Sequence, residues 1–172
     1  MKKLLLAAVF TALGTGLSYA QIEKGNSLIS ANVGIGSTFA TSGATASLPI
    51  GLSYEYAIND KMTAGAFGMY AGAKWDNAWG GKDWKWNYIF VGAMYNYHFV
   101  NDEKWDVYAG GRLGFINVSF DDGGTGITSP STSGVGYAIQ GGARYFFTKS
   151  LAANAELGYG FSYLRIGLTY KL

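Results

Sequence analysis

The chain has 172 residues, with 13 Lys and Arg, 11 Asp and Glu, one His and no Cys. Without Cys there is no disulfide or thiolate metal site, and a single His excludes the usual multi-histidine metal sites, so we expect no cofactor and no metal. Charged residues make up 14%, below the share of about 25% in ordinary soluble domains. The 49% of hydrophobic residues excludes a disordered chain.

The first twenty residues have the pattern of a secretory signal peptide. Lys2 and Lys3 precede an apolar run at residues 4–16, and the sequence Ser18-Tyr19-Ala20 then places small residues at the positions where a signal peptidase cuts. The run is shorter than the about 20 residues of a spanning helix, which disfavours the alternative of an N-terminal membrane anchor. We therefore predict cleavage after residue 20 and a mature domain over 21–172. The mature chain has 13 − 2 = 11 basic and 11 acidic residues, so its charge gives no reason to expect nucleic acid.

From residue 27 onward the apolar residues recur with period two, which predicts β-strands. The first predicted strand covers 27–36. In the second, 48–58, Tyr54 and its even-numbered neighbours form an apolar face, and Glu55 lies on the opposite one. In the third, 62–75, many small residues make it impossible to say which side chains point inward, and a bulge could switch the two faces.

The fourth and fifth predicted strands cover 85–100 and 105–120. In the fourth strand Ile89 and Val91 share the apolar face with Tyr95, whereas the opposite face is polar and contains Asn96 and His98. In the fifth strand the two faces separate in the same way. Its apolar face has Val107, Leu113 and Phe115, and its other face has Asp106, Tyr108 and Arg112.

The last three predicted strands alternate cleanly. They cover residues 135–147, 151–159 and 163–172, and none has a charge on its apolar face. Tyr163 falls on the same face as Arg165 in this alternation. The prediction is thus an all-β chain of eight strands.

The connections alternate between short and long. Residues 59–60, 101–103 and 149–150 read as tight hairpin turns. Looser loops are predicted at 37–46, 76–84 and 121–134, with a short connection near Gly160. This pattern predicts an antiparallel up-and-down barrel with both termini at the short-turn end.

The polar face decides between a soluble lipocalin-like carrier and an outer-membrane barrel. A carrier needs an apolar lumen, whereas a membrane barrel has an apolar exterior and a polar interior. The minor face is polar, so we predict a transmembrane β-barrel filled by an ion-pair network, with a gate or narrow ion path as the alternative. The predicted lumen residues are Glu55, Asn96, His98, Arg112, Gln140, Arg144, Glu156 and Arg165.

Aromatic residues gather near the strand ends, as in the interface girdles of membrane barrels. The predicted girdle at the short-turn end includes Tyr54, Tyr56, Tyr97, Trp105 and Phe147. The predicted girdle at the other end consists of Trp75, Trp79, Trp84 and Trp86. A carbohydrate or partner platform is the alternative for these four tryptophans.

The mature start at 21–26, the repeated Gly-x-x-Tyr hairpins and the ending at 154–172 carry a family resemblance. The chain resembles small eight-stranded outer-membrane proteins of the OmpX and OmpA transmembrane-domain type, and more closely the β-barrel proteins of Bacteroidota. Its ending resembles the signal read by the barrel assembly machinery, with Leu172 in place of the common Phe. The matching positions are Arg165, Gly167, Tyr170 and Leu172.

The resemblance implies a monomeric outer-membrane protein, exported after signal-peptide removal and surrounded by outer-membrane lipid. We expect a non-enzymatic structural or surface-interaction role with an unidentified surface ligand. Three alternatives stay open: a narrow solute pore, an adhesin acting through the three long loops, and a lipid-modifying enzyme. The enzyme would require His98, but no Ser lies near it in the sequence, so a lumen hydrogen bond is the expected role.

Overall fold

The computed structural model describes residues 21–38, 43–126 and 132–172. The predicted signal peptide, and the loop residues 39–42 and 127–131, lie outside the described residues. In the described part of the chain, no helix is long and apolar enough to cross a membrane.

The structure consists of β-strands joined by turns and loops. Strands form because β-branched and aromatic residues alternate with small or polar ones, which suits a pleated sheet with two different faces. The strands are β1 (Ser27–Ser37), β2 (Thr45–Ala46), β3 (Ile50–Asn59), β4 (Met62–Trp79), β5 (Lys82–Asn101), β6 (Trp105–Asp121), β7 (Thr132–Phe146), β8 (Leu151–Tyr159) and β9 (Ser162–Lys171).

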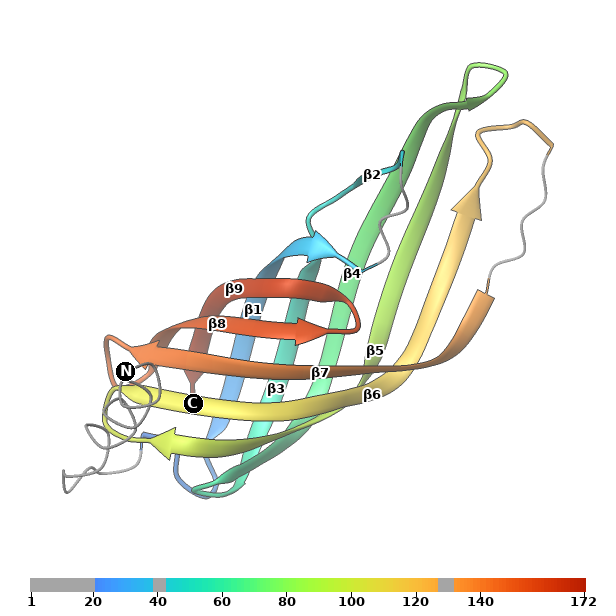
Figure 1. Ribbon diagram of the computed structural model, residues 1–172. Helices are drawn as coiled ribbons and strands as arrows, with labels where there is room; N and C mark the ends of the chain where they lie inside the picture. The colour runs from blue at the N-terminus through green and yellow to red at the C-terminus, as the bar shows by residue number, and fades with distance from the viewer. Residues whose placement is uncertain (1–20, 39–42, 127–131) are drawn as a thin grey trace, which may run out of the picture.

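The strands form a closed antiparallel barrel (Figure 1). From β3 to β9 each strand pairs with the next strand in the chain, and β1 pairs with β3 on one side and with β9 on the other, which closes the ring. The short β2 and the longer β3 both pair with β4, at successive heights, so they occupy one strand position in the barrel. Nine strands therefore make an eight-stranded barrel, as the alternation predicts. Closure leaves no open sheet edge around the barrel body.

The short turns lie together at one end of the barrel, as predicted. They connect β3 to β4, β5 to β6 and β7 to β8. Gln21 reaches this end, where its side chain donates a hydrogen bond to the Lys149 carbonyl at 2.6 Å. The last residue, Leu172, lies beside the start of β1, with its backbone N–H 2.8 Å from the Ser27 carbonyl. Gln21, the first described residue, and the C-terminus therefore share the short-turn end.

The four strands β4 to β7 are longer than the others. They have 18, 20, 17 and 15 residues, whereas β1, β3, β8 and β9 have 11, 10, 9 and 10. Their far ends project beyond the rim formed by β8 and β9 (Figure 1). We call this projecting part, residues 71–79, 82–88, 116–121 and 132–136, the wall. The barrel thus has one tall side at the end opposite the short turns.

The wall corrects two loop predictions. Residues 76–84 form most of a tight hairpin, because β4 continues to Trp79 and β5 begins at Lys82. Gly80 and Gly81 connect them with φ angles of 59° and 74°, the conformation of a two-residue hairpin turn that favours glycine. The predicted loop 121–134 is also shorter, since β7 begins at Thr132.

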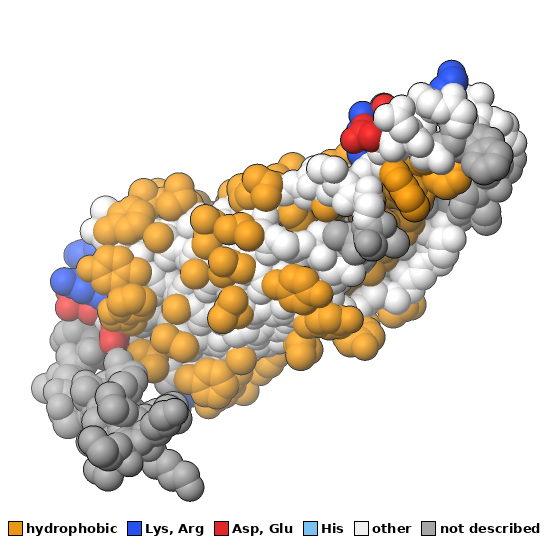
Figure 2. All heavy atoms as spheres, turned by 45° about the horizontal axis from the view of Figure 1, so that its top comes forward, with side chains coloured by type: hydrophobic (Ala, Val, Ile, Leu, Met, Phe, Trp, Pro, Cys, Tyr) orange, Lys and Arg blue, Asp and Glu red, His pale blue; other side chains and the backbone are white. Residues whose placement is uncertain are grey.

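The predicted facing of the strands is confirmed over the barrel body. Apolar side chains such as Leu52, Leu113 and Leu168 are more than half exposed, at 63%, 62% and 53%. Figure 2 shows hydrophobic side chains over the body and charged ones at both ends. In β4, whose facing was open, the odd-numbered Thr63, Phe67, Met69, Ala71 and Ala73 are buried throughout.

Tyr163 is an exception to the predicted facing. It was expected to share the inner face with Arg165, but it is 53% exposed, whereas Ser162 is fully buried. Two residues, instead of one, therefore separate the inward side chains of Ser162 and Arg165. The shift lies at the rim, opposite Gly36, which has a φ of 72°. An irregular strand end of this kind cannot be read from strict alternation.

Candidate functional site

A polar layer fills the middle of the barrel, and Arg144 on β7 joins two of its acids. Arg144 Nη1 donates to Asp106 Oδ2 at 2.8 Å, and Arg144 Nη2 donates to Glu55 Oε1. The guanidinium also lies 4.2 Å from the centre of the Tyr108 ring. All four residues are buried, so the single positive charge of Arg144 offsets part of the charge of the two carboxylates away from water.

His98 on β5 extends this group. Its Nδ1 lies 2.5 Å from Asp106 Oδ1, and its Nε2 lies 3.1 Å from Thr63 Oγ1. Thr63 in turn donates its hydroxyl hydrogen to Glu55 Oε2 at 2.7 Å. Asn96 donates to the same Glu55 oxygen at 2.8 Å and accepts from Gln140 at 2.9 Å, in a sequence of hydrogen bonds across the lumen.

A second group forms around Glu156 on β8. Its carboxylate accepts hydrogen bonds from Arg112 Nη2 at 3.1 and 3.2 Å, from Arg165 Nε at 2.7 Å and from the Tyr108 hydroxyl at 2.9 Å. Two guanidinium groups thus share one carboxylate. In the group around Arg144, by contrast, one guanidinium pairs with two carboxylates.

All eight residues predicted for the lumen are brought together in this layer: Glu55, Asn96, His98, Arg112, Gln140, Arg144, Glu156 and Arg165. The site residues that the prediction omits are Thr63, Asp106 and Tyr108. Asp106 and Tyr108 lie on the same face of β6 as Arg112. Their shared position in the alternation could have identified them as lumen residues. Thr63 lies on the strand whose facing was left open.

Apolar layers close the lumen above and below the polar one. At the short-turn end, Ile22 and Leu28 pack with Ala57, Phe146 and Ala152. Toward the wall, a larger apolar cluster fills the interior, so the polar lumen predicted from the sequence is only its middle part. This cluster consists of Phe67, Met69, Ala71, Phe90, Met94, Ala138 and Phe161.

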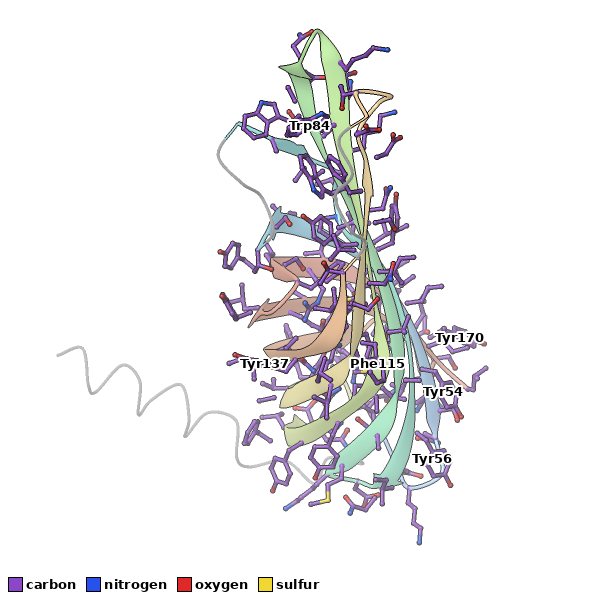
Figure 3. The ribbon with its side chains drawn as sticks, turned by 90° about the vertical axis from the view of Figure 1, so that its right-hand side faces the viewer. Tyr54, Tyr56, Trp84, Phe115, Tyr137 and Tyr170 are labelled. Atoms are coloured by element: carbon purple, nitrogen blue, oxygen red, sulfur yellow. The ribbon has the colours of Figure 1, made fainter. Side chains whose placement is uncertain are left out.

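The predicted girdle at the short-turn end lies on the outer surface. Tyr54, Tyr56, Trp105 and Phe147 are between 44% and 50% exposed, and Tyr97 is half-buried beside Phe99, at a centroid distance of 5.1 Å. Figure 3 shows Tyr54 and Tyr56 pointing away from the barrel.

The predicted girdle of tryptophans at the other end differs from the structure. Trp75 continues the inward residues Phe67 to Ala73 of β4, and Trp84 and Trp86 continue the inward Phe90 of β5. These three side chains therefore face the inside of the wall instead of the lipid. Trp79 is in β4, and its side chain lies outside the described residues.

The inward tryptophans form a cluster with Phe120 of β6, and we call these four residues the aromatic cluster. Trp84 lies 6.4 Å from Trp75, 6.3 Å from Trp86 and 5.7 Å from Phe120, measured between ring centroids, all in edge-to-face geometry. Trp86 and Phe120 are 5.1 Å apart. Figure 3 shows Trp84 near the top of the wall, far from the lower girdle.

Apart from Val135 at its base, the outer face of the wall is polar. Above Ile89 and Phe115, the outward positions become Asn87 and Asn117, and Asn117 donates to Ser133 Oγ at 2.8 Å. This change marks the upper limit of the apolar band that faces lipid. The wall above this limit carries its polar residues outside and its aromatic residues inside.

Charged residues are paired on this outer face. Lys74 Nζ lies 2.6 Å from Asp76 and 2.8 Å from Asp83. Its hydrogen bond lowers the pKa of the Asp83 carboxyl below 3.8, and the Asn77 backbone N–H adds a second hydrogen bond at 3.1 Å. The same two carboxylates raise the pKa of Lys74.

The predicted assembly signal lies along β9 and ends at Leu172, the residue that follows this strand. Arg165 points inward, Gly167 pairs with Asn32 of β1, and Tyr170 and Leu172 point outward with 50% and 64% exposure. The outward aromatic and aliphatic residues of this ending thus remain accessible along the strand. Among the described residues, no group of three acidic, His or Cys side chains could hold a metal ion.

Comparisons with known proteins agree with this architecture. The sequence model of the outer membrane protein beta-barrel domain matches residues 5–171. Pseudomonas aeruginosa OprG has 16% identity and a TM-score of 0.56, over 90% of this chain and 99% of that one. The N-terminal barrel of P. aeruginosa OprF has 16% identity and a TM-score of 0.54, over 88% and 100%.

Yersinia pestis Ail, the attachment invasion locus protein, has 18% identity and a TM-score of 0.51, over 87% and 99%. No curated protein matches the chain. These structural neighbours share the fold, and they confirm the resemblance to small outer-membrane barrels. Together with the match over nearly the whole sequence, they show that the chain belongs to the outer membrane protein β-barrel domain family.

Proposed function

We propose that this outer-membrane protein is a non-enzymatic surface-interaction protein whose wall binds an extracellular ligand. The observation that carries the proposal is the reversal of polarity between the body and the wall. The body is apolar outside and holds the polar layer in the middle of its interior, whereas the wall is polar outside and carries the aromatic cluster inside. An aromatic surface turned away from lipid, with polar groups nearby, suits ligand binding.

The filled lumen argues against the pore alternative. A water path would have to cross the apolar cluster around Phe90, the paired charges around Arg144 and the apolar layer around Phe146. Eight strands enclose a space just wide enough for side chains. The barrel is therefore better suited to anchoring the wall than to conducting solutes.

Burial argues against the lipid-modifying alternative. His98 lies between Asp106 and the Thr63 hydroxyl, an order that resembles a nucleophile with its base and orienting acid. However, the side chains of His98 and Asp106 are fully buried, Thr63 is 0% exposed, and its hydroxyl donates to Glu55. A lipid headgroup cannot reach this hydroxyl, so we assign the three residues to packing of the lumen.

The charges of the wall favour a neutral ligand. The wall carries Lys74, Lys82 and Lys85 against Asp76, Asp83 and Asp121, which is three of each sign. One structure of Ail holds sucrose octasulfate, a heparin analogue. A strongly sulfated ligand would gain no net attraction from this balanced wall. We therefore propose a neutral glycan, whose C–H faces can stack on tryptophan rings.

An array of neutral oligosaccharides tests the proposal on the purified full barrel in detergent. We expect binding by the unmodified protein, and a loss of at least tenfold in affinity when Trp84→Ala and Trp86→Ala are combined. Trp105→Ala is the matched control, because Trp105 lies in the girdle at the opposite end, and it should bind normally. Equal binding by all three proteins, or none by the unmodified one, would reject the role of the wall.

We also propose that the chain reaches the membrane by signal-peptide export and insertion by the barrel assembly machinery. Lys2, Lys3 and the apolar run support cleavage after residue 20. The outward Tyr170 of β9 and the exposed Leu172 that follows this strand support recognition of the C-terminal ending. Mass spectrometry of the mature protein should give a start at Gln21, and Leu172→Lys should lower its amount in the outer membrane.

A further inference from the structure

His98 lies in a chain of three hydrogen bonds inside the polar layer. Its Nδ1 lies 2.5 Å from Asp106 Oδ1, its Nε2 lies 3.1 Å from Thr63 Oγ1, and Thr63 Oγ1 lies 2.7 Å from Glu55 Oε2. The side chains of His98 and Asp106 are fully buried, and Thr63 and Glu55 are 0% and 1% exposed. Bulk water therefore does not reach these four groups, and they must supply one another's hydrogen-bond donors.

The three hydrogen bonds need three hydrogen atoms, one more than these side chains carry in their ordinary charge states. An ionised carboxylate has no hydrogen to donate, whereas a hydroxyl and a neutral imidazole donate one each. Thr63 gives its hydrogen to Glu55, so its oxygen can only accept from His98 Nε2. The carboxylate of Asp106 can only accept from His98 Nδ1. His98 makes both contacts only when each of its ring nitrogens carries a hydrogen.

We propose that His98 is an imidazolium in the folded barrel, and that this bound proton makes the stability of the barrel depend on pH. A neutral ring would turn a lone pair toward an acceptor, either Asp106 or Thr63, and leave one of the hydrogen bonds unmade. A buried acceptor that loses its donor destabilises a fold. This charge state is independent of the ligand proposed for the wall.

The charged groups that face His98 favour the added proton. Asp106 of β6 contacts the ring directly, and the Tyr108 ring of the same strand lies 5.6 Å away, measured between ring centroids. Glu55 of β3 lies beyond the bridging hydroxyl, and Arg144 of β7 pairs with both carboxylates. With a neutral ring, two carboxylates stand against one guanidinium in this group. The proton makes the balance two against two.

The remaining charges of the layer belong to the second group. Arg112 and Arg165 both pair with Glu156 there, so the proton gives the whole layer four cations against three carboxylates. Coulomb energies fall with distance, and the carboxylate in contact with the ring is that of Asp106. The nearest charge to His98 is therefore negative, although the layer as a whole is not.

Nitrogen NMR counts the hydrogens on the ring directly. The chain has a single His, so labelling histidine with nitrogen-15 gives the signals of one ring only. The full barrel in detergent micelles is measured at about pH 8, where an ordinary histidine is neutral. We expect both ring nitrogens to have the chemical shift of a protonated nitrogen. One nitrogen without a hydrogen would overturn the proposal, because the third hydrogen would then lie on Glu55 or be missing.

Two threonine variants test the hydrogen-bond count. Thr63→Val keeps the shape of the side chain and removes the hydroxyl acceptor, so Nε2 no longer needs a hydrogen, and the ring should become neutral at the same pH. Thr169→Val is the matched control, because Thr169 is a buried threonine of β9 whose hydroxyl pairs with Ser30 and Asn154. This control should keep the imidazolium. Equal protonation of His98 in both variants would contradict the count.

Unfolding gives an independent measurement. A histidine in an unfolded chain is largely neutral above about pH 6.5, whereas the folded barrel keeps the proton, so unfolding releases it. Stability should therefore fall as pH rises, and the unfolding constant in urea should increase about tenfold per pH unit above that value, until the folded barrel also loses the proton. His98→Asn lacks this proton and should lack this part of the pH dependence. Equal pH dependence of unfolding in the two proteins would overturn the proposal.

Discussion

Trp84 lies directly opposite Trp75 on neighbouring strands, and both side chains point to the inner side of the wall, not to the lipid. The alternation of β4 and β5 is unbroken from the buried Phe67 and Phe90 to these tryptophans. The same alternation that points Phe67 and Phe90 into the lumen therefore also points these tryptophans inward. The proposed role of the wall in binding a surface ligand depends on this relationship.

Replacing Arg144 should destabilise the barrel. Arg144→Leu leaves the buried carboxylates of Glu55 and Asp106 without their shared cation, and breaking a buried ion pair in this way costs about 3–5 kcal/mol. Urea unfolding of the barrel in detergent micelles measures the change. Lys61→Ala, at an exposed turn position, should change stability by less than about 0.5 kcal/mol. Equal stability of the two variants would contradict a dry ion pair.

Replacing His98 should leave membrane lipids unchanged. His98→Ala removes the hydrogen bonds to Thr63 and Asp106, so we expect lower stability of the barrel. Since the side chain is buried, lipid A should have the same mass spectrum in cells with and without the substitution. A difference in lipid A at equal protein levels would reveal an enzymatic role.

The barrel should not conduct ions. The apolar layers around Phe90 and Phe146 lie above and below the paired charges, so an ion would have to leave water without compensation. Planar bilayer recordings should give no resolved current steps for the unmodified protein. Reproducible single-channel steps would show that a water path crosses the lumen and would revive the pore alternative.

The Asp83 carboxyl should titrate below its ordinary range. Lys74 stabilises the ionised form by a hydrogen bond, so the folded-state pKa lies below 3.8. A lowered pKa means that the contact contributes stability above the ordinary pKa and loses it as pH falls through the lowered value. NMR titration should show this low midpoint, and Lys74→Ala should move it upward. An unchanged midpoint in the variant would exclude Lys74 as the cause.

Period-two alternation was sufficient to predict the closed barrel and most of its lumen. The residues Glu55, Arg112, Arg144, Glu156 and Arg165 could be placed together because charges on one face of closely spaced strands must meet inside. The pattern was clear in the strands that carry these charges, whereas the facing of 62–75 was left open. The pairing of particular partners depends on barrel register, which alternation alone does not give.

The wall could not be predicted in the same way. Residues 76–84 contain Gly80, Gly81 and several polar residues, a composition typical of a loop, yet the two glycines support a tight turn that lets both strands continue. Tryptophans near a strand end also suit a membrane girdle by composition alone. The side chain of Trp84 lies on the same inner face of β5 as Phe90. This orientation distinguishes an aromatic cluster inside the wall from a girdle that faces lipid.

Quenching of single tryptophans tests the central claim most directly. One variant keeps Trp84 and another keeps Trp105, with the remaining tryptophans changed to Phe, and both are inserted into lipid bilayers. We predict that brominated lipid quenches the emission of Trp105 and leaves that of Trp84 unchanged, whereas aqueous iodide quenches Trp84. Quenching of Trp84 by brominated lipid would contradict the account, because it would place the aromatic cluster in the membrane.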